Sequence, residues 1–306
     1  MINQKLGIRK GLFFIVCLVF FSMSCTRFSK HDGLLIAVSI PPQAWFVSQI
    51  AGDKVQVLVL AGPGQNPHNY EPSPRQIQAL SAASAWILSG TEFEISLLPK
   101  ITVLFPNLPI IDGTQGVQFR PLDDHDHDEH GCCDTAHHTP DSALFNIDRH
   151  TWLGREPAKI LAAHIRDTLS RLDNENETYY RERYENLVSE IDKVFDELKT
   201  VLSPLQGRSI FVYHPSFGYF LDEFGIRQEA VETGGKEPTP RQLNLLIAKI
   251  NEEQAAAVFV QSQFPVNAAR TLANAVGANV IELDPLSSDW LENIRFMGQM
   301  LQRAIR

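Results

Sequence analysis

The stretch Glu71-Pro72-Ser73-Pro74-Arg75-Gln76 returns almost unchanged as Glu237-Pro238-Thr239-Pro240-Arg241-Gln242, more than half of the 306-residue chain later. In both copies a serine or threonine followed by proline is typical of the first residues of a helix. Each copy is predicted to lead into a helix and then a strand. The recurrence therefore predicts two halves that are built alike, and His68, just before the first copy, suggests a site between them.

Short apolar runs alternate with helical patterns in both halves, which predicts an α/β fold with mostly parallel sheets flanked by helices. The expected strands are 34–40, 55–60, 85–90 and 109–113, then 209–213, 227–231, 255–260 and 279–283. The expected helices are 43–51, 74–83, 156–172, 174–202, 240–252, 267–276 and 290–305. The helix from Asn174 to Leu202 would run roughly 42 Å at about 1.5 Å per residue, long enough to bridge two lobes. We predict lobes at 33–172 and 204–306, joined by a linking helix within 173–203.

The N-terminus has the pattern of an export signal. Lys5, Arg9 and Lys10 precede the apolar run Gly11–Met23, which is too short to span a bilayer comfortably. We predict a signal peptide over residues 1–25, with Cys25 as a candidate site of lipid attachment. The protein is then exported, either to the periplasm or to a membrane surface through a lipidated Cys25. Ordinary signal cleavage nearby is the alternative.

Composition narrows the class of protein. Hydrophobic content of 44% and charged content of 21% are typical of a globular chain, and the net charge of −9 argues against nucleic acid as a partner. Besides Cys17 and Cys25, the chain holds only the adjacent pair Cys132-Cys133. Neighbouring cysteines rarely form a structural disulfide. We therefore expect an ordinary hydrophobic core and no disulfide framework.

Residues 123–139, DDHDHDEHGCCDTAHHT, differ from the rest of the chain because they contain no large apolar side chain. Such a composition cannot build a core, so a loop is expected. Imidazole and thiolate groups suit Zn²⁺ and Cu⁺. We predict an accessory metal-binding loop that uses the five histidines of the segment, His125, His127, His130, His137 and His138. The alternative is a solvated insertion without a role.

Three histidines and one aspartate outside this loop are candidate metal ligands. In open α/β sheets ligands bind beyond the carboxyl ends of the strands. His68, His214 and Asp284 each follow a predicted strand and so lie at such ends. His150 lies in a connection of its own. Three imidazoles and a carboxylate make a suitable tetrahedral shell for Zn²⁺. Each of these residues alone could instead be an ordinary hydrogen-bonded turn residue.

The candidate metal site could belong to a binding protein or to an enzyme. The HExxH, GxSxG and GxxxxGK[ST] motifs are absent from the sequence. Three histidines without Asp284 would nevertheless form the open shell of a catalytic zinc site. A zinc-dependent hydrolase therefore remains the less favoured alternative.

Several motifs, taken together, resemble the periplasmic metal receptors of bacterial ABC importers, specifically the zinc-uptake branch. The resemblance covers essentially the whole chain after the signal. Its motifs are Ile40-Pro41-Pro42-Gln43, Gly64-Gln65-Asn66-Pro67-His68-Asn69-Tyr70-Glu71-Pro72, Asp148-Arg149-His150-Thr151-Trp152-Leu153, His214-Pro215-Ser216-Phe217-Gly218-Tyr219-Phe220 and Leu283-Asp284-Pro285-Leu286. Arg149 departs from the pattern, because the family commonly has proline there.

The resemblance implies a substrate-binding protein, not an enzyme, that binds Zn²⁺ between two lobes and delivers it to a membrane permease. It implies the ligands His68, His150 and His214, with Asp284 or a water molecule at the fourth position. The manganese branch typically has glutamate at the position of His214, so zinc is favoured over manganese or another divalent metal. A metal-dependent adhesin on the same fold stays an alternative, and we expect a monomer.

Overall fold

The structure is a computed structural model that describes residues 33–122, 147–232, 239–253, 255, 257–264 and 266–304. The predicted signal peptide 1–25 with Cys25, and the predicted metal-binding loop 123–139, lie outside the described residues. Residues Gly33–Arg306 form one unit by their internal contacts. Among the described helices, none combines the length and apolar composition needed to cross a membrane.

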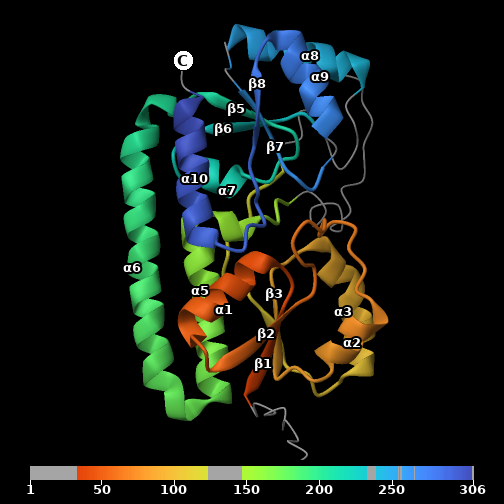
Figure 1. The fold of residues 1–306 in the computed structure, drawn as a ribbon, viewed down its shortest axis with the longest axis vertical. Helices are drawn as coiled ribbons and strands as arrows, with labels where there is room; N and C mark the ends of the chain where they lie inside the picture. Colours follow the sequence, from red (N-terminus) through yellow and green to blue (C-terminus); the bar gives the residue numbers. More distant parts are fainter. Residues whose placement is uncertain are drawn as a thin grey trace, which may run out of the picture. The chain divides into compact units, whose positions relative to one another are not determined.

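The first lobe is built on a four-stranded parallel sheet in the order β2-β1-β3-β4 (Figure 1). Its strands are β1 (Leu34–Val38), β2 (Val55–Val59), β3 (Ala85–Leu88) and β4 (Ile110–Asp112). All of β3 and the last three residues of β1 are buried, as expected for central strands covered on both faces. The helices of this lobe are α1 (Pro41–Ala51), α2 (Pro74–Leu80) and α3 (Glu92–Leu104).

Helix α3 is a difference from the sequence prediction, which assigned no helix to this segment. Pro99 lies inside it, and a proline in a helix interior usually marks a break. The first turn is stabilised by the Glu94 carboxylate. That carboxylate accepts hydrogen bonds at 2.7–3.0 Å from the backbone N–H groups of Ser89, Gly90 and Thr91. This contact places Glu92 at the edge of the first lobe, beside His68.

The second lobe repeats the topology of the first, with a parallel sheet in the order β6-β5-β7-β8. Its strands are β5 (Ser209–Val212), β6 (Arg227–Ala230), β7 (Ala257–Val260) and β8 (Asn279–Glu282). Its helices are α7 (Gly218–Asp222), α8 (Pro240–Glu252), α9 (Val266–Val276) and α10 (Trp290–Arg303). In both sheets the first strand in the chain lies between the second and the third. The prediction of two similar α/β lobes is therefore confirmed.

The recurring sequence forms the same hydrogen bonds in both lobes. Before α2, the backbone N–H of Ser73 donates to Gln76 Oε1 at 2.9 Å, and the Gln76 N–H donates to Ser73 Oγ at 3.4 Å. Before α8, the corresponding distances between Thr239 and Gln242 are 2.9 and 3.3 Å. These are reciprocal capping boxes, which satisfy N–H groups that a helix leaves without partners at its start.

A long helix, α6 (Glu177–Leu202), joins the lobes, as predicted. Its 26 residues span about 39 Å. It packs along α5 (Arg155–Leu172) and α1 on one part of its length and along α10 on another (Figure 1). Gly298 of α10 allows the close contact there, because a Cβ at that position would clash with Leu198 Cδ2. Short 3₁₀ turns flank the long helices: η1 (Thr151–Leu153), η2 (Asn174–Asn176) and η3 (Ser203–Leu205).

Candidate metal centre

His68 lies in the loop that follows β2. Its backbone N–H donates to Asn66 Oδ1 at 3.0 Å, which stabilises a tight turn just before the histidine. Further along, the Tyr70 hydroxyl donates to the Leu60 carbonyl at 2.6 Å, and Gln76 Nε2 donates to the same oxygen at 2.8 Å. The loop is thus held at both ends against the carboxyl end of β2. His68 is half-buried there, with 29% of its side chain exposed.

His150 lies just before η1, in the segment between β4 and α5. Its backbone N–H and its Nδ1 lie 2.9 and 2.8 Å from Asp148 Oδ1. The turn after it is tied to the second lobe through two indoles. Trp152 Nε1 donates to the Pro285 carbonyl, and Trp290 Nε1 donates to the Trp152 carbonyl, both at 2.7 Å. His150 is therefore buried and held from both sides.

His214 follows β5 in the second lobe and is also buried. Its carbonyl accepts a hydrogen bond from Gln261 Nε2 at 2.6 Å, which fixes the backbone of the loop. The imidazole stacks on Phe264, with ring centroids 4.4 Å apart and an angle of 21° between the planes. On its other side, Nδ1 lies 3.2 Å from Glu232 Oε1. These contacts leave Nε2 directed away from the second lobe.

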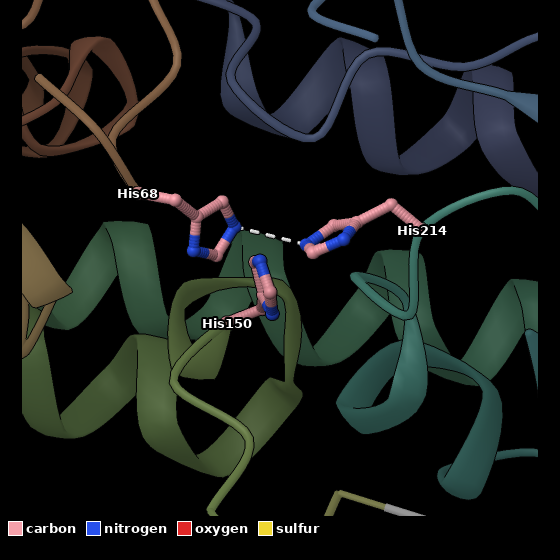
Figure 2. A group of neighbouring side chains, drawn as sticks. All are labelled: His68, His150 and His214. Carbon is pink, nitrogen blue, oxygen red and sulfur yellow. Dashed lines mark hydrogen bonds between the residues drawn. The ribbon is translucent and has the colours of Figure 1, made fainter. Parts of the chain in front are cut away.

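The three imidazoles converge on one point from three separate segments (Figure 2). One nitrogen of each lies within 4.8 Å of the others, and the Nε2 atoms of His68 and His214 are 2.9 Å apart. They line a cavity of about 20 Å³. Room of about 10–15 Å³ is needed for one water molecule. The space between the rings therefore suits a single ion or a single water.

Each imidazole has a carboxylate at its Nδ1. Glu92 Oε2 lies 3.0 Å from Nδ1 of His68, and the corresponding partners are Asp148 for His150 and Glu232 for His214. An ionised carboxylate can only accept, so Nδ1 carries a hydrogen, and a neutral imidazole then keeps its lone pair on Nε2. Metal-binding histidines are oriented by carboxylates in this way. The described part of the chain thus presents three Nε2 lone pairs to one point.

The electrostatics of the cluster follow from these pairs. Burial opposes the charge of Glu92, but the hydrogen bond and charge of His68 outweigh it and lower the pKa of Glu92 to about 2. Burial likewise opposes the charge of His68, yet the contact with Glu92 raises the pKa of its imidazole above the ordinary value. In His214, burial and repulsion from the two other histidines lower the pKa to about 4, against the opposing effect of Glu232.

This geometry fits a small cation with a preference for nitrogen ligands. Nitrogen atoms bound tetrahedrally to zinc at about 2.0–2.1 Å lie roughly 3.3 Å apart. The 2.9 Å between the Nε2 atoms of His68 and His214 is a few tenths of an ångström shorter. Small side-chain shifts would therefore admit the ion. Buried neutral imidazoles, such as His214 at neutral pH, suit Zn²⁺ better than the oxygen-preferring Mn²⁺.

Asp284 is not in the cluster of described metal-binding groups. Its Oδ1 instead accepts hydrogen bonds from Gln263 Nε2 at 2.8 Å and from the backbone N–H of Leu286 at 2.9 Å. The five histidines of the loop 123–139 fall outside the described residues.

Two carboxylates of the site, Glu92 and Glu232, were not singled out by the sequence. Glu232 is the second residue after β6, so the same strand-end rule that selected His214 could have selected it. Glu92 lies at the start of a helix that was not predicted. The pattern Thr91-x-x-Glu94 could have revealed that helix start, since it has the form of a capping box.

Comparisons with known proteins agree with this geometry. The sequence model of a family described as ZnuA, zinc-uptake complex component A periplasmic, matches residues 36–304. The high-affinity zinc uptake system protein ZnuA of Yersinia pestis is 28% identical over 288 residues, covering 88% of this chain and 90% of that protein. The zinc-binding lipoprotein AdcA of Streptococcus pneumoniae is 28% identical over 281 residues. That match covers 88% of this chain but 53% of AdcA, so the chain spans about half the length of AdcA.

The fold is similar to a solved structure of the same family. A crystal structure of a ZnuA deletion mutant with zinc bound has a TM-score of 0.78 and 34% sequence identity. The match covers 89% of this chain and 98% of that one. The resemblance drawn from the sequence motifs is thereby confirmed. Because the family model spans both sheets, the linking helix and all three clustered histidines, this chain belongs to the ZnuA family, the periplasmic component A of zinc-uptake complexes.

Proposed function

We propose that this protein is an extracytoplasmic receptor that binds Zn²⁺ through His68, His150 and His214 and delivers it to the permease of an ABC transporter. The observation that carries the proposal is the convergence of three carboxylate-oriented imidazoles on a cavity of one-ion size. The names of the relatives, a zinc uptake protein and a zinc-binding lipoprotein, support zinc as the cargo.

A receptor needs reversible binding rather than turnover. The family is one of substrate-binding receptors and not an enzyme class. Each lobe contributes a histidine, His68 from the first and His214 from the second, so binding and release are coupled to the contact between lobes. We propose that the protein works as a monomer outside the cytoplasm, in the periplasm or attached to the membrane through Cys25. Zinc and the permease are its partners.

The alternatives make different demands on the same site. A manganese receptor would need oxygen ligands in the cluster, but in the described residues the clustered metal-binding groups are imidazoles alone. A zinc hydrolase would use the open fourth position for an activated water and would show turnover that chelation abolishes. A metal-dependent adhesin would not require a permease, so a permease gene beside this one would favour the receptor.

The test is the zinc affinity of His214→Ala, measured by competition with a chromogenic chelator. Removal of one of three imidazoles is expected to abolish tight binding, because the two remaining nitrogens cannot complete a tetrahedral site. His164→Ala is the matched control, since His164 lies outside the cluster and contacts the Gln115 carbonyl at 2.9 Å. Tight zinc binding that survives in His214→Ala would refute the assignment. Zinc-dependent growth of a receptor-deficient bacterium that carries the gene would test delivery.

A further inference from the structure

Asp148, the carboxylate that orients His150, is itself held by an arginine. One of its oxygens, Oδ1, lies 2.9 Å from the backbone nitrogen of His150 and 2.8 Å from its Nδ1. The other oxygen, Oδ2, accepts a hydrogen bond from Arg120 Nη1 at 2.9 Å. The Asp148 side chain is fully buried. Both oxygens of this carboxylate are therefore engaged, and Arg120 fixes the direction in which it faces His150.

Arg120 connects the same carboxylate to the second lobe. Its Nε donates to Asp222 Oδ2 in α7 at 2.8 Å. The guanidinium lies against Gly218 at the start of α7, where a Cβ would clash with it. A guanidinium is planar and its donors point in fixed directions, so it holds two carboxylates at set angles to each other. The position of α7 therefore determines the position of the Asp148 carboxylate.

Tyr219, the second residue of α7, holds the backbone at the same place. Its hydroxyl accepts a hydrogen bond from the Arg120 N–H at 3.1 Å and donates to the Asp148 carbonyl at 3.0 Å. The Asp148 N–H in turn donates to the Arg120 carbonyl at 2.9 Å. One hydroxyl thus uses its donor and an acceptor to hold both backbones. The side chain and the backbone of Asp148 are both tied to the second lobe.

The two other orienting carboxylates are supported differently. Each comes from the same lobe as the histidine that it contacts: Glu92 for His68 in the first lobe, and Glu232 for His214 in the second. Asp148 precedes α5, outside the second lobe, yet its support passes through Arg120 to a helix of that lobe. The orientation of His150 is therefore sensitive to where the second lobe lies.

We propose that Arg120 and Tyr219 are positioning residues for zinc binding, which transmit the position of the second lobe through Asp148 to His150. While α7 stays in contact, His150 is held with its Nε2 toward the ion. When α7 moves away, Asp148 loses its support and His150 loses its orientation, so zinc release is coupled to separation of the lobes. This inference rests on the proposed zinc function and adds a route by which lobe position reaches one ligand.

The first test compares zinc affinities by chelator competition. Loss of a group that orients a metal ligand typically weakens binding by about 10–100-fold, and this range is expected for Asp148→Ala. Arg120→Lys keeps the charge, but a lysine is a point cation that cannot hold two carboxylates at fixed angles. Its loss should lie near the lower end of that range. Tyr219→Phe keeps the ring without the hydroxyl and should show a smaller loss.

The double variant Arg120→Lys/Asp148→Ala separates the route through Asp148 from any other. If Arg120 acts through Asp148, the double variant should bind zinc as tightly as Asp148→Ala alone, because the shared contact is already gone. A further loss of affinity in the double variant would show that Arg120 reaches the site in another way, and it would overturn the inference.

Two matched controls separate positioning from general stability. Tyr180→Phe removes a hydroxyl that donates to Asp173 at 2.6 Å, and Arg183→Lys alters a guanidinium that donates to the Gln49 carbonyl at 2.6 Å. Both should lower the unfolding temperature of the metal-free protein and leave zinc affinity unchanged. If the two test variants behave like these controls, their role is structural only and the inference is wrong.

A second readout needs no zinc. In NMR spectra of the metal-free protein, the Nδ1–H proton of His150 should exchange slowly with water, because it is buried and hydrogen-bonded. Arg120→Lys and Tyr219→Phe should speed this exchange at His150 and leave the Nδ1–H of His214 unaffected. Equally slow exchange at His150 in both variants would contradict the proposal. If the unchanged protein fails to bind zinc tightly, the proposed function fails, while this readout still decides whether Arg120 and Tyr219 position His150.

Discussion

Gly218→Ala should lower both the stability of the protein and its affinity for zinc, although Gly218 does not touch the metal cluster. A Cβ at Gly218 would clash with the Arg120 guanidinium and approach Asp148 Oδ2 to 2.7 Å. Arg120 donates to that oxygen at 2.9 Å and, through Nε, to Asp222 at 2.8 Å. The Asp148 side chain is fully buried, so it depends on Arg120 and His150 to stay ionised. The substitution would push Arg120 out of this contact.

Two known costs bracket the effect of Gly218→Ala on stability. Overpacking in a filled site costs about 1–3 kcal/mol, and a buried charge that loses its partner costs about 3–5 kcal/mol. Because Arg120 is displaced and not deleted, a loss of about 3 kcal/mol, where the ranges meet, is expected. At about 2.1 cal/mol/K per residue, 1 kcal/mol corresponds to roughly 1.6 °C in a chain of this length. The unfolding temperature of the metal-free protein should therefore fall by about 5 °C.

The same change should lower zinc affinity, because Asp148 orients His150. A loss of about tenfold, the lower end of the range for groups that orient ligands, is expected in chelator competition. Gly62→Ala is the control, since a Cβ there would meet only Gln65 Oε1 at 3.6 Å. If displacement of Arg120 is the cause, Gly218→Ala should add nothing in an Arg120→Ala background. Additive losses in the double variant, or an unchanged unfolding temperature, would refute this reasoning.

Zinc affinity should fall between about pH 8 and 5, because a protonated imidazole cannot bind metal. The contact with Glu92 raises the pKa of His68, so as the pH falls protons displace zinc from His68 first. Glu92→Gln should therefore shift the loss of zinc affinity to lower pH. A loss of affinity at the same pH as in the unchanged protein would contradict this. Deletion of residues 123–139 should leave one tight zinc site by calorimetry and remove the weaker ones, since the clustered histidines lie elsewhere. Ser73→Ala and Thr239→Ala should each cost about 1 kcal/mol in denaturant unfolding. Their costs should add, because the two capping boxes lie in different lobes.

The scaffold could be predicted from sequence where local signals are strong. The two capping boxes marked the starts of α2 and α8, and apolar runs marked all eight described strands to within a few residues. The lobe borders at 172 and 204 stay a prediction. Helix α3 was missed because Pro99 interrupts its pattern, and the short α7 was missed because five residues give no periodicity.

The site could be predicted only in part. The strand-end rule selected His68 and His214, whose nitrogens the fold brings together. It selected Asp284 for the same reason, but the rule cannot tell which way a side chain points, and Asp284 turns to Gln263. The carboxylates that contact the histidines could not be predicted, because these contacts join segments that are far apart in the chain. Glu92 and His68, for example, meet only because α3 begins beside the loop after β2.

The spacing of the three imidazoles along the chain has a consequence for biosynthesis. No fragment that ends before His214 contains all three, and the carboxylate that orients His214 comes later still, at Glu232. A polypeptide that is truncated within its second lobe therefore cannot assemble the cluster, however well its first lobe folds. Tight binding of metal thus indicates that both lobes have been translated and folded. The cluster is therefore a built-in marker of an intact molecule.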